Sequence, residues 1–414
     1  MDVPALEFGF EPHLTGTVVL WVAAGATLGS ISGLVPGIHA NNFALLLAGF
    51  APSIPGPPLY VGCAMLAAGV VHTFMNAVPA MALGVPDAEM AVTSLPGHRM
   101  VLEGRGGEAM RLSAIGSLLA VLVAIPFAIP ITMAVTAVYP QLQASLSYLL
   151  IAVVLGLIAI EYTWQRRVAG VLSFLLAGLL GWATLDLSPE APLEAGGMLA
   201  PLFAGLFGAP VLIDAVRGGG VPPQTESGIR LSRPLLVWTA LAGAVAGAVV
   251  GYLPGISAAI AAVAVLFLVP GGITDRGYIV ATSGVDTANM IFALFALAAI
   301  GQPRSGVMVA FDSIGAPLEL PILLGTVVLA GCLGFVLVIL VGDVYLEIVG
   351  QLTYWKISAV VLSVLVVLSY LFTGLPGVGV FAVAALVGMV PLRLRARRVH
   401  LMGVLLYPLI LTGL

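Results

Sequence analysis

The sequence predicts an all-α, polytopic membrane protein with roughly ten to twelve transmembrane helices, in two inverted-topology repeats that contain broken or re-entrant helices. Three observations predict this fold class: an apolar composition, long stretches without charge, and a glycine- and proline-rich motif that occurs twice. Of the 414 residues, 60% are hydrophobic and 8% are charged, whereas about a quarter of the residues in a soluble domain are charged. This composition excludes a soluble enzyme, and no patch of the kind that binds nucleic acid is present.

Four stretches of the chain contain no Asp, Glu, Lys or Arg. They lie between Glu11 and Asp87, Arg111 and Glu161, Arg233 and Asp275, and Lys356 and Arg393. Because about 20 apolar residues span a bilayer as a helix, each stretch has room for about one to three crossings. Lipid offers no partners to free backbone amides, so the spans are expected to be helical. The acidic N-terminus lacks the basic region of a secretory signal, so the first apolar stretch is expected to remain as a span in the cell membrane.

Arginines mark three connections between the predicted spans, which the positive-inside rule places in the cytoplasm. They are Arg166, Arg167, Arg217, Arg230, Arg233, Arg393, Arg395, Arg397 and Arg398. The acidic N-terminal tail and the acidic segment 186–194 are expected to face the opposite side. The predicted organisation is an extracytoplasmic tail at 1–16, a first membrane repeat at 17–213, a cytoplasmic linker at 214–234, and a second repeat with the C-terminal helices at 235–414.

An internal repeat is the most informative feature of the sequence. One motif contains Gly25, Gly29, Gly33, Pro36, Gly37 and Ile38, and the other contains Gly243, Gly247, Gly251, Pro254, Gly255 and Ile256. Each residue of the second motif lies 218 positions after its counterpart, a constant spacing that chance rarely gives. With the tail outside and the linker inside, the two copies enter the membrane from opposite sides, which predicts an inverted repeat.

The Pro-Gly pair that ends each motif predicts an interrupted helix. Glycines four residues apart let another helix approach closely, while proline removes an amide donor and glycine tolerates most backbone angles. In transporters built from inverted repeats, such interruptions lie near the bilayer midplane, where exposed backbone dipoles bind ions and charged substrates. We therefore expect Pro36, Gly37, Pro254 and Gly255 to line a substrate site. The alternative is a kink that binds no ligand.

Polar side chains follow both predicted interruptions. His39, Asn41 and Asn42 follow the first, and Ser257 follows the second. Polar residues are costly to bury at membrane depth, so these four are candidates for substrate binding. Their alternative role is structural, as helix caps or as hydrogen-bonding partners of neighbouring helices.

A second pair of polar clusters lies farther along each repeat, at an offset of 217 residues. The first runs from His72 to Asn76 ahead of Gly84 and Pro86, and the second runs from Asp286 to Asn289 ahead of Gly301 and Pro303. Asp286, Thr287 and Asn289 are candidates for ion coupling, with Asp286 as a ligand for Na⁺ or as a proton carrier. An ordinary acid at the end of a loop is the alternative. Arg304 is a candidate for holding a substrate carboxylate, or else marks the membrane edge.

These motifs resemble the large membrane subunit of the tripartite tricarboxylate transporters, the TctA family, and more closely its shortened archaeal-type relatives. The resemblance covers nearly the whole chain and is carried by residues 25–37, 93–109, 251–255 and 286–289. The loop Thr93–Ala109 is the most specific part, because it resembles the family's stretch DG-x-P-M-x-x-x-G-x-A-x-x-A-L. Without the family, the alternating charges of that loop favour an amphipathic surface helix, which either only solvates a connection or serves in docking a partner or in gating.

The resemblance implies the membrane permease of a secondary transporter for carboxylates, that is, for organic anions of the tricarboxylate type. It implies coupling to a gradient of Na⁺ or H⁺. The partners that it implies are a small membrane subunit and an extracytoplasmic binding protein. The chain departs from the family pattern at His39, Asn41 and Asn42 and at Gly301–Arg304, and these differences leave the substrate open.

Two other functional classes have to be weighed. A translocase for polyprenyl phosphate or another lipid carrier would also use inverted repeats, Pro-Gly interruptions and an arginine. An enzyme is not expected, because the sequence contains no Gly-x-Ser-x-Gly turn and no His-Glu-x-x-His zinc site. Cys63 and Cys332 lack metal-type spacing, so no metal or cofactor is expected beyond the coupling ion.

Overall fold

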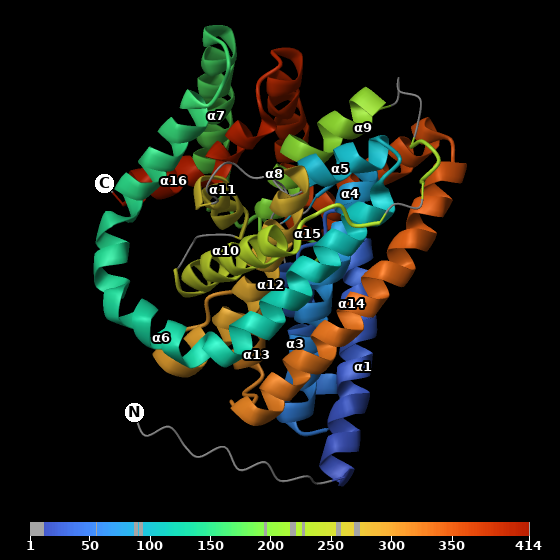
Figure 1. Ribbon diagram of the computed structural model, residues 1–414, viewed down its shortest axis with the longest axis vertical. Helices are drawn as coiled ribbons and strands as arrows, with labels where there is room; N and C mark the ends of the chain where they lie inside the picture. The colour runs from blue at the N-terminus through green and yellow to red at the C-terminus, as the bar shows by residue number, and fades with distance from the viewer. Residues whose placement is uncertain are drawn as a thin grey trace.

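The computed structural model describes residues 12–54, 56–86, 90, 94–193, 197–215, 221–225, 228–253, 258–268 and 274–413. Over these residues the chain is helical and contains no strand, which confirms the predicted all-α class. Eight of the described helices are long and apolar enough to cross a membrane, and three shorter apolar helices accompany them. The chain is a multi-pass membrane protein whose helices pack into one bundle (Figure 1).

The two halves of the chain begin with the same order of helices. The first half contains α1 (Pro12–Leu34), α2 (Ala40–Phe50), α3 (Pro58–Met75), α4 (Ala77–Leu83), α5 (Ser94–Leu102), α6 (Gly106–Ala159), α7 (Trp164–Thr184), α8 (Leu199–Phe203) and α9 (Ala209–Ala215). The second contains α10 (Arg233–Tyr252), α11 (Ala258–Leu268), α12 (Asp275–Ile300), α13 (Gly306–Ser313), α14 (Leu320–Gln351), α15 (Tyr354–Arg393) and α16 (Gly403–Thr412). A long helix, a half-length helix and a second long helix therefore open each half, as α1–α3 and α10–α12.

Within the first half, α1 and α3 run parallel and in close contact. A Cβ atom on Gly25 would lie 2.2 Å from the carbonyl oxygen of Ala64, and one on Gly29 would lie 2.4 Å from that of Ala68. Only glycine permits this approach, because any larger residue would push the two helices apart. Residue numbers rise in the same direction along both helices. The connection between them therefore has to run back along the length of the pair, and α2 spans about 16 Å of that distance.

The second glycine motif builds the same pair of helices. A Cβ atom on Gly243 would lie 2.2 Å from the carbonyl oxygen of Ala281, and one on Gly247 would lie 2.5 Å from that of Val285. These two acceptors follow their counterparts in the first half by 217 residues. The packing of α10 on α12 thus reproduces that of α1 on α3, and the repeat predicted from glycine spacing is present in three dimensions.

The two repeats run in opposite directions where they meet. Gly69 of α3 faces Met290 of α12, and farther along, Asn76 faces Asp286. Residue numbers rise along one helix as they fall along the other, so α3 and α12 are antiparallel. Because each of these helices is parallel to the first helix of its own repeat, the predicted inverted arrangement is confirmed.

The first predicted interruption is a break in the helix. Pro36 and Gly37 separate α1 from α2, and the φ angle of Gly37 is 83°, a left-handed value that glycine adopts at little cost. The second interruption separates α10 from α11. Its residues Pro254, Gly255 and Ser257 lie outside the described residues.

Two further glycines show how far the repeat extends. Gly84 follows α4 and Gly301 follows α12, and both have a φ angle of 68°. Each ends its helix in the left-handed conformation that glycine commonly supplies at helix C-termini. The 217-residue correspondence therefore holds for backbone conformation as well as for sequence.

The remaining long helices lie outside the helix pairs that α1 forms with α3 and α10 forms with α12. α6 contains three prolines, Pro126, Pro130 and Pro140, and Figure 1 shows it arching away from the bundle before the chain turns into α7. α15 is interrupted at Gly374, which has a φ angle of 62° and a ψ angle of −162°. A Cβ atom on Gly374 would lie 2.5 Å from the carbonyl oxygen of Glu190, so the acidic segment between α7 and α8 packs on this interruption.

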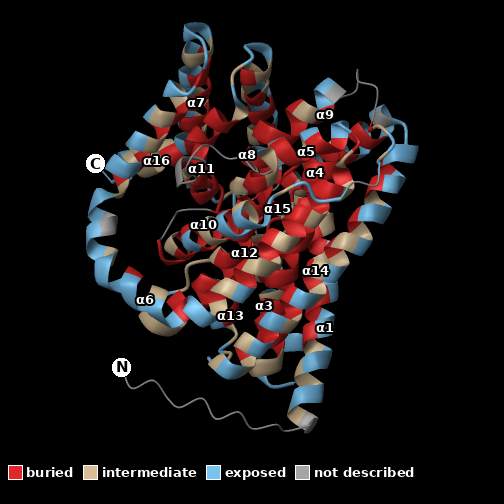
Figure 2. Ribbon diagram, in the orientation of Figure 1, coloured by how far each residue is buried: buried red, intermediate tan, exposed pale blue. Residues whose placement is uncertain are grey.

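Burial separates a central group of helices from the exposed helices and helix faces around it (Figure 2). The most apolar stretch of α3 and α4 is entirely buried. On α14, by contrast, Leu340, Val344 and Ile348 follow one another at helical spacing with 61%, 55% and 52% of their surface exposed. Such an exposed apolar stripe is unfavourable in water, and we assign it to the surface that contacts lipid.

The basic connections lie together at one end of the bundle. The Arg167 side chain donates to the backbone carbonyl of Glu161, and the Arg397 backbone amide donates to the carboxylate of the same residue. Arg398 lies close enough to His98 of α5 for its charge to lower the pKa of that imidazole. This grouping agrees with the positive-inside rule. The boundaries predicted for the tail, linker and repeats remain predictions.

Candidate functional site

A buried polar cluster lies where the antiparallel helices α3 and α12 meet, and we call it the central cluster. It consists of Ser32, His72, Thr73, Asn76, Asp286 and Thr287, and none of these residues is more than 3% exposed. Polar groups at membrane depth are costly unless they are hydrogen-bonded, and they commonly mark functional sites. The cluster is therefore the first candidate for a site that handles ions or substrate.

Hydrogen bonds of the central cluster connect the two repeats. The Asn76 Nδ2 atom donates to Asp286 Oδ2 over 3.1 Å. The Oγ1 atoms of Thr73 and Thr287 are 3.0 Å apart and share a hydrogen bond. Both contacts join α3 of the first repeat to α12 of the second, so a change at Asp286 is felt directly at the interface between the repeats.

A third hydrogen bond of the cluster lies within the first repeat. The Ser32 hydroxyl of α1 is 2.8 Å from His72 Nδ1 of α3. A Cβ atom on Gly33 would lie 3.0 Å from the Asn76 amide nitrogen. The last turn of α1, directly before Pro36 and Gly37, therefore packs beside the central cluster.

The helix of the first repeat lacks one backbone hydrogen bond at the cluster. α3 ends at Met75 and α4 begins at Ala77. Pro79 has no amide hydrogen and so cannot donate the helical bond to the Met75 carbonyl. The Met75 carbonyl, one residue before Asn76, therefore lacks its usual helical donor.

Serine side chains extend the polar region along the contact between α6 and α12. The hydroxyls of Ser113 and Ser283 are 2.8 Å apart, and Ser117 donates to the backbone carbonyl of Ser283 over 3.2 Å. All three serines are buried. Ser283 lies one turn before Asp286 and Thr287 on the same face of α12.

Sequence reasoning missed these serines. The only signals were the four-residue spacing of Ser113 and Ser117 and the position of Ser283 one turn ahead of Asp286. Neither signal is specific, because serines in helices commonly bond to their own backbone.

The polar residues after the first break make bonds of the structural kind. His39 caps α2, with its Nδ1 accepting from the Asn41 amide over 3.1 Å. Asn41 Oδ1 accepts from the Val307 amide in the first turn of α13 over 3.3 Å. Asn42 Nδ2 has no hydrogen-bond partner in the described part of the chain. α2 nevertheless begins beside the cluster, because Ala40 and His72 line one small gap between α2 and α3.

Two other candidate residues lie outside the central cluster. Arg304 donates to the Tyr139 hydroxyl over 3.4 Å and lies 5.9 Å from the centre of that ring. The helix runs on from Asp286 for about 21 Å before it ends near Arg304. Asn289 is partly exposed, and its backbone packs against Gly251 of α10. Of the three candidates for ion coupling, Asp286 and Thr287 belong to the cluster and Asn289 does not.

The donor set of the cluster favours a singly charged cation or a proton. The central cluster contains one carboxylate, Asp286, and one imidazole, His72, among neutral oxygen donors, whereas transition-metal sites commonly use three or more His, Cys, Asp or Glu ligands. No group of three or more His, Cys, Asp or Glu residues that could hold a metal occurs among the residues that the structure describes. The chemistry available here is therefore reversible binding of one positive charge at Asp286.

Comparisons with known proteins identify the family. The model of the tripartite tricarboxylate transporter TctA family matches residues 19–403. An uncharacterised protein of Methanocaldococcus jannaschii is 27% identical over 405 residues, which are 95% of this chain and 98% of that protein. An uncharacterised 52.8 kDa protein of Agrobacterium vitis is 28% identical over 182 residues, which are 42% of this chain and 34% of that protein. No solved structure matches the chain.

The family match covers nearly all of the helices described above, including both glycine motifs and the central cluster. The sequence resemblance and the family model therefore agree. This multi-pass membrane protein belongs to the tripartite tricarboxylate transporter TctA family, which is a family of transporters and not of enzymes.

Proposed function

We propose that the chain is the permease of a secondary transporter that moves carboxylates of the tricarboxylate type, driven by a gradient of Na⁺ or H⁺. The family supports transport of this class of anion. The single observation that supports ion coupling is the contact between Asp286 and Asn76, which joins the two inverted repeats at a buried carboxylate.

The proposed coupling is electrostatic. A negative charge is costly to bury in an apolar interior, so Asp286 gains from a bound Na⁺ or proton. Thr73 and Thr287, with the Met75 carbonyl, offer the neutral oxygen atoms that complete a small cation site. Binding of the cation offsets the charge of Asp286, and a negatively charged substrate can then enter nearby at a lower electrostatic cost.

The substrate is proposed to bind beside the break between α1 and α2. The first amides of α2 form a helix N-terminus, which attracts anions. His39 and Asn41 already bond to backbone amides there, so their part is to shape the site, and the carboxamide of Asn42 is the donor offered to a substrate carboxylate. Pro254, Gly255 and Ser257 are proposed as the matching contribution of the second repeat.

Partners are proposed from the family alone. A small membrane subunit and an extracytoplasmic binding protein would complete the three-part system, with the binding protein delivering the anion to the permease. A lipid-carrier translocase, the alternative from the residues, is not favoured by a family of carboxylate transporters.

The proposal is tested by uptake into proteoliposomes. Purified protein, alone and together with the candidate partner subunits, is given labelled citrate under an imposed Na⁺ or pH gradient. We expect Asp286→Asn to reduce gradient-driven uptake to background. Asp312→Asn is the matched control, because Asp312 is an exposed acid of α13, and it is expected to transport like the parent. Normal gradient-driven uptake by Asp286→Asn would remove this carboxylate from the mechanism.

A further inference from the structure

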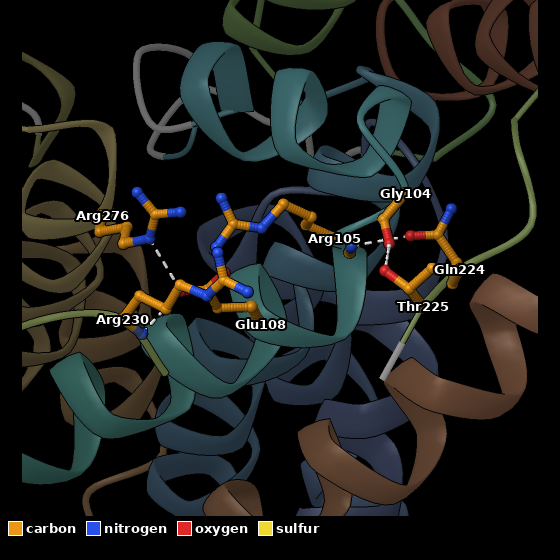
Figure 3. A network of polar contacts seen from close by, with 8 residues as sticks. Gly104, Arg105, Glu108, Gln224, Thr225, Arg230 and Arg276 are labelled. Carbon is orange, nitrogen blue, oxygen red and sulfur yellow. Dashed lines mark hydrogen bonds and ion pairs between the residues drawn. The ribbon is translucent and has the colours of Figure 1, made fainter. Parts of the chain in front are cut away.

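A second buried charged group lies outside the central cluster, at the basic end of the bundle. Glu108, in the first turn of α6, has no exposed side-chain surface. Arg276 Nε of α12 donates to Glu108 Oε1 over 2.8 Å, and the backbone amide of Arg230 donates to the same oxygen over 2.9 Å. Arg105 donates to the other carboxylate oxygen. Figure 3 shows these groups converging on the one carboxylate.

Three parts of the chain meet at Glu108: helix α6 of the first repeat, helix α12 of the second, and the segment that links the repeats. The linker is fastened next to Glu108 by two more contacts (Figure 3). The Gly106 amide donates to Gln224 Oε1 over 2.7 Å, and the Thr225 amide donates to the Gly104 carbonyl over 2.8 Å.

Glu108 and the groups that donate to it lie at one end of the polar contact between α6 and α12. Along α12, Ser283 lies about 10 Å beyond Arg276, and Asp286 lies about 15 Å beyond it. The corresponding contact of the other repeat, between α14 and α3, is apolar along its buried face. The buried residues in that part of α14 are Leu323, Thr326, Val327, Ala330, Gly331, Gly334 and Val338, with one hydroxyl among them. Of these two contacts, the one between α6 and α12 therefore offers polar groups between the basic end and Asp286.

We propose that the contacts of Glu108 hold a gate between α6 and α12 closed, and we call Glu108 with its donors the latch. From the linker, Gln224, Thr225 and Arg230 contribute to the closed state. While Arg276 and the Arg230 amide bind Glu108, the two helices stay together and water does not reach Ser283. Release of Glu108 lets α12 move from α6 and opens a hydrated path to Asp286. This inference rests on the proposed transport function, because opening the gate would expose Asp286, the proposed coupling residue, to one side of the membrane.

Neighbouring ion pairs do not serve this role equally well. Arg99 and Asp275 pair over 3.0 Å with 61% and 45% of their side chains exposed, and Arg111 and Asp343 are similarly exposed. Exposed pairs are screened by water and contribute little. The buried carboxylate is different, because removing its charge leaves two guanidinium groups without their partner.

The latch is tested by cysteine labelling, which needs no substrate. Ser283→Cys is introduced in a Cys332→Ala background, and its reaction with a small neutral maleimide is followed by mass spectrometry. Ser283 is 0% exposed, so labelling of the parent is expected to be slow. Adding Glu108→Gln is expected to raise the labelling rate at position 283 by about tenfold or more, and adding Gln224→Ala is expected to raise it less.

The native Cys63 is the internal control, because it is also 0% exposed and lies on α3 away from the latch. The proposal requires Cys63 to stay as slow in Glu108→Gln as in the parent. Unchanged labelling at position 283 would overturn the latch. Faster labelling at both positions would overturn it as well, because it would mean general loosening of the bundle. Absence of citrate uptake, by contrast, would contradict the proposed substrate and leave this result unaffected.

Discussion

Replacing Gly25 by alanine adds one methyl group to α1 at a point where α3 leaves no room for it. The new Cβ would lie 2.2 Å from the carbonyl oxygen of Ala64, whereas packed heavy atoms prefer about 3.5 Å or more, so the helices must separate by over about 1 Å. Overpacking of this kind costs about 1–3 kcal/mol, and the higher helix propensity of alanine offsets up to about 1 kcal/mol of it. We expect the free energy of unfolding to fall by about 1–2 kcal/mol. Gly243→Ala meets the same 2.2 Å distance in the second repeat and should cost about as much.

The assay is reversible unfolding in mixed micelles, followed by circular dichroism as denaturing detergent is added. Gly16→Ala on α1 and Gly325→Ala on α14 are the matched controls, because a Cβ atom at either position meets nothing within 4 Å. Both controls should be as stable as the parent or slightly more stable. If Gly25→Ala and Gly243→Ala unfolded like these controls, the close parallel packing of the two helix pairs would be wrong.

Three further predictions concern single positions. Gly84→Ala and Gly301→Ala each force alanine into a left-handed conformation at a cost of about 1–2 kcal/mol. Thermal unfolding should show the larger loss of stability for Gly84→Ala, because the new Cβ would also lie 2.8 Å from a side chain of α9. Burial, followed by the nearby charge of Arg398, holds the pKa of His98 below 6.5 despite its bond to a backbone carbonyl. The unfolded chain therefore takes up that proton first, so stability should fall as the pH drops below about 6.5, and His98→Gln should flatten this part of the profile. Asn76→Ala removes the amide that donates to Asp286; because that donor stabilises the charged carboxylate, its loss should lower the ion concentration needed for half-maximal uptake, whereas the same change at Asn42 should alter the half-maximal substrate concentration instead.

Much of the fold could be predicted because the sequence repeats itself in register. Gly25 and Gly243 occupy equivalent places in two parallel helix pairs, and the break at Pro36 and Gly37 follows from the chemistry of those two residues alone. For Gly84 and Gly301 the offset of 217 residues predicts that the two glycines are counterparts, whereas their left-handed conformation at a helix end is visible only in the structure.

The partners of the functional residues could not be predicted in the same way. The repeat gives the correspondence of Ala64 with Ala281, but it does not give the antiparallel register in which α3 meets α12. The sequence therefore indicates Asp286 as a candidate for ion coupling but does not identify Asn76 as its partner. For Arg304 the sequence leaves two roles open, holding a substrate carboxylate or marking the membrane edge, and the described contacts of its side chain are with the ring and hydroxyl of Tyr139.

In the structure, the two inverted repeats meet at the central cluster. Cross-linking Thr73→Cys to Thr287→Cys tests this arrangement most directly. Both changes are made in a background in which Cys63 and Cys332 are replaced by alanine. The two hydroxyl oxygens are 3.0 Å apart across the repeats, so mild oxidation in membranes should form a disulfide within the monomer. Thr73→Cys paired with Asn289→Cys should not cross-link, because residue 289 lies on the face of α12 that packs against α10. No cross-link from position 73 to position 287, or an equal yield with position 289, would contradict the arrangement on which the proposed coupling depends.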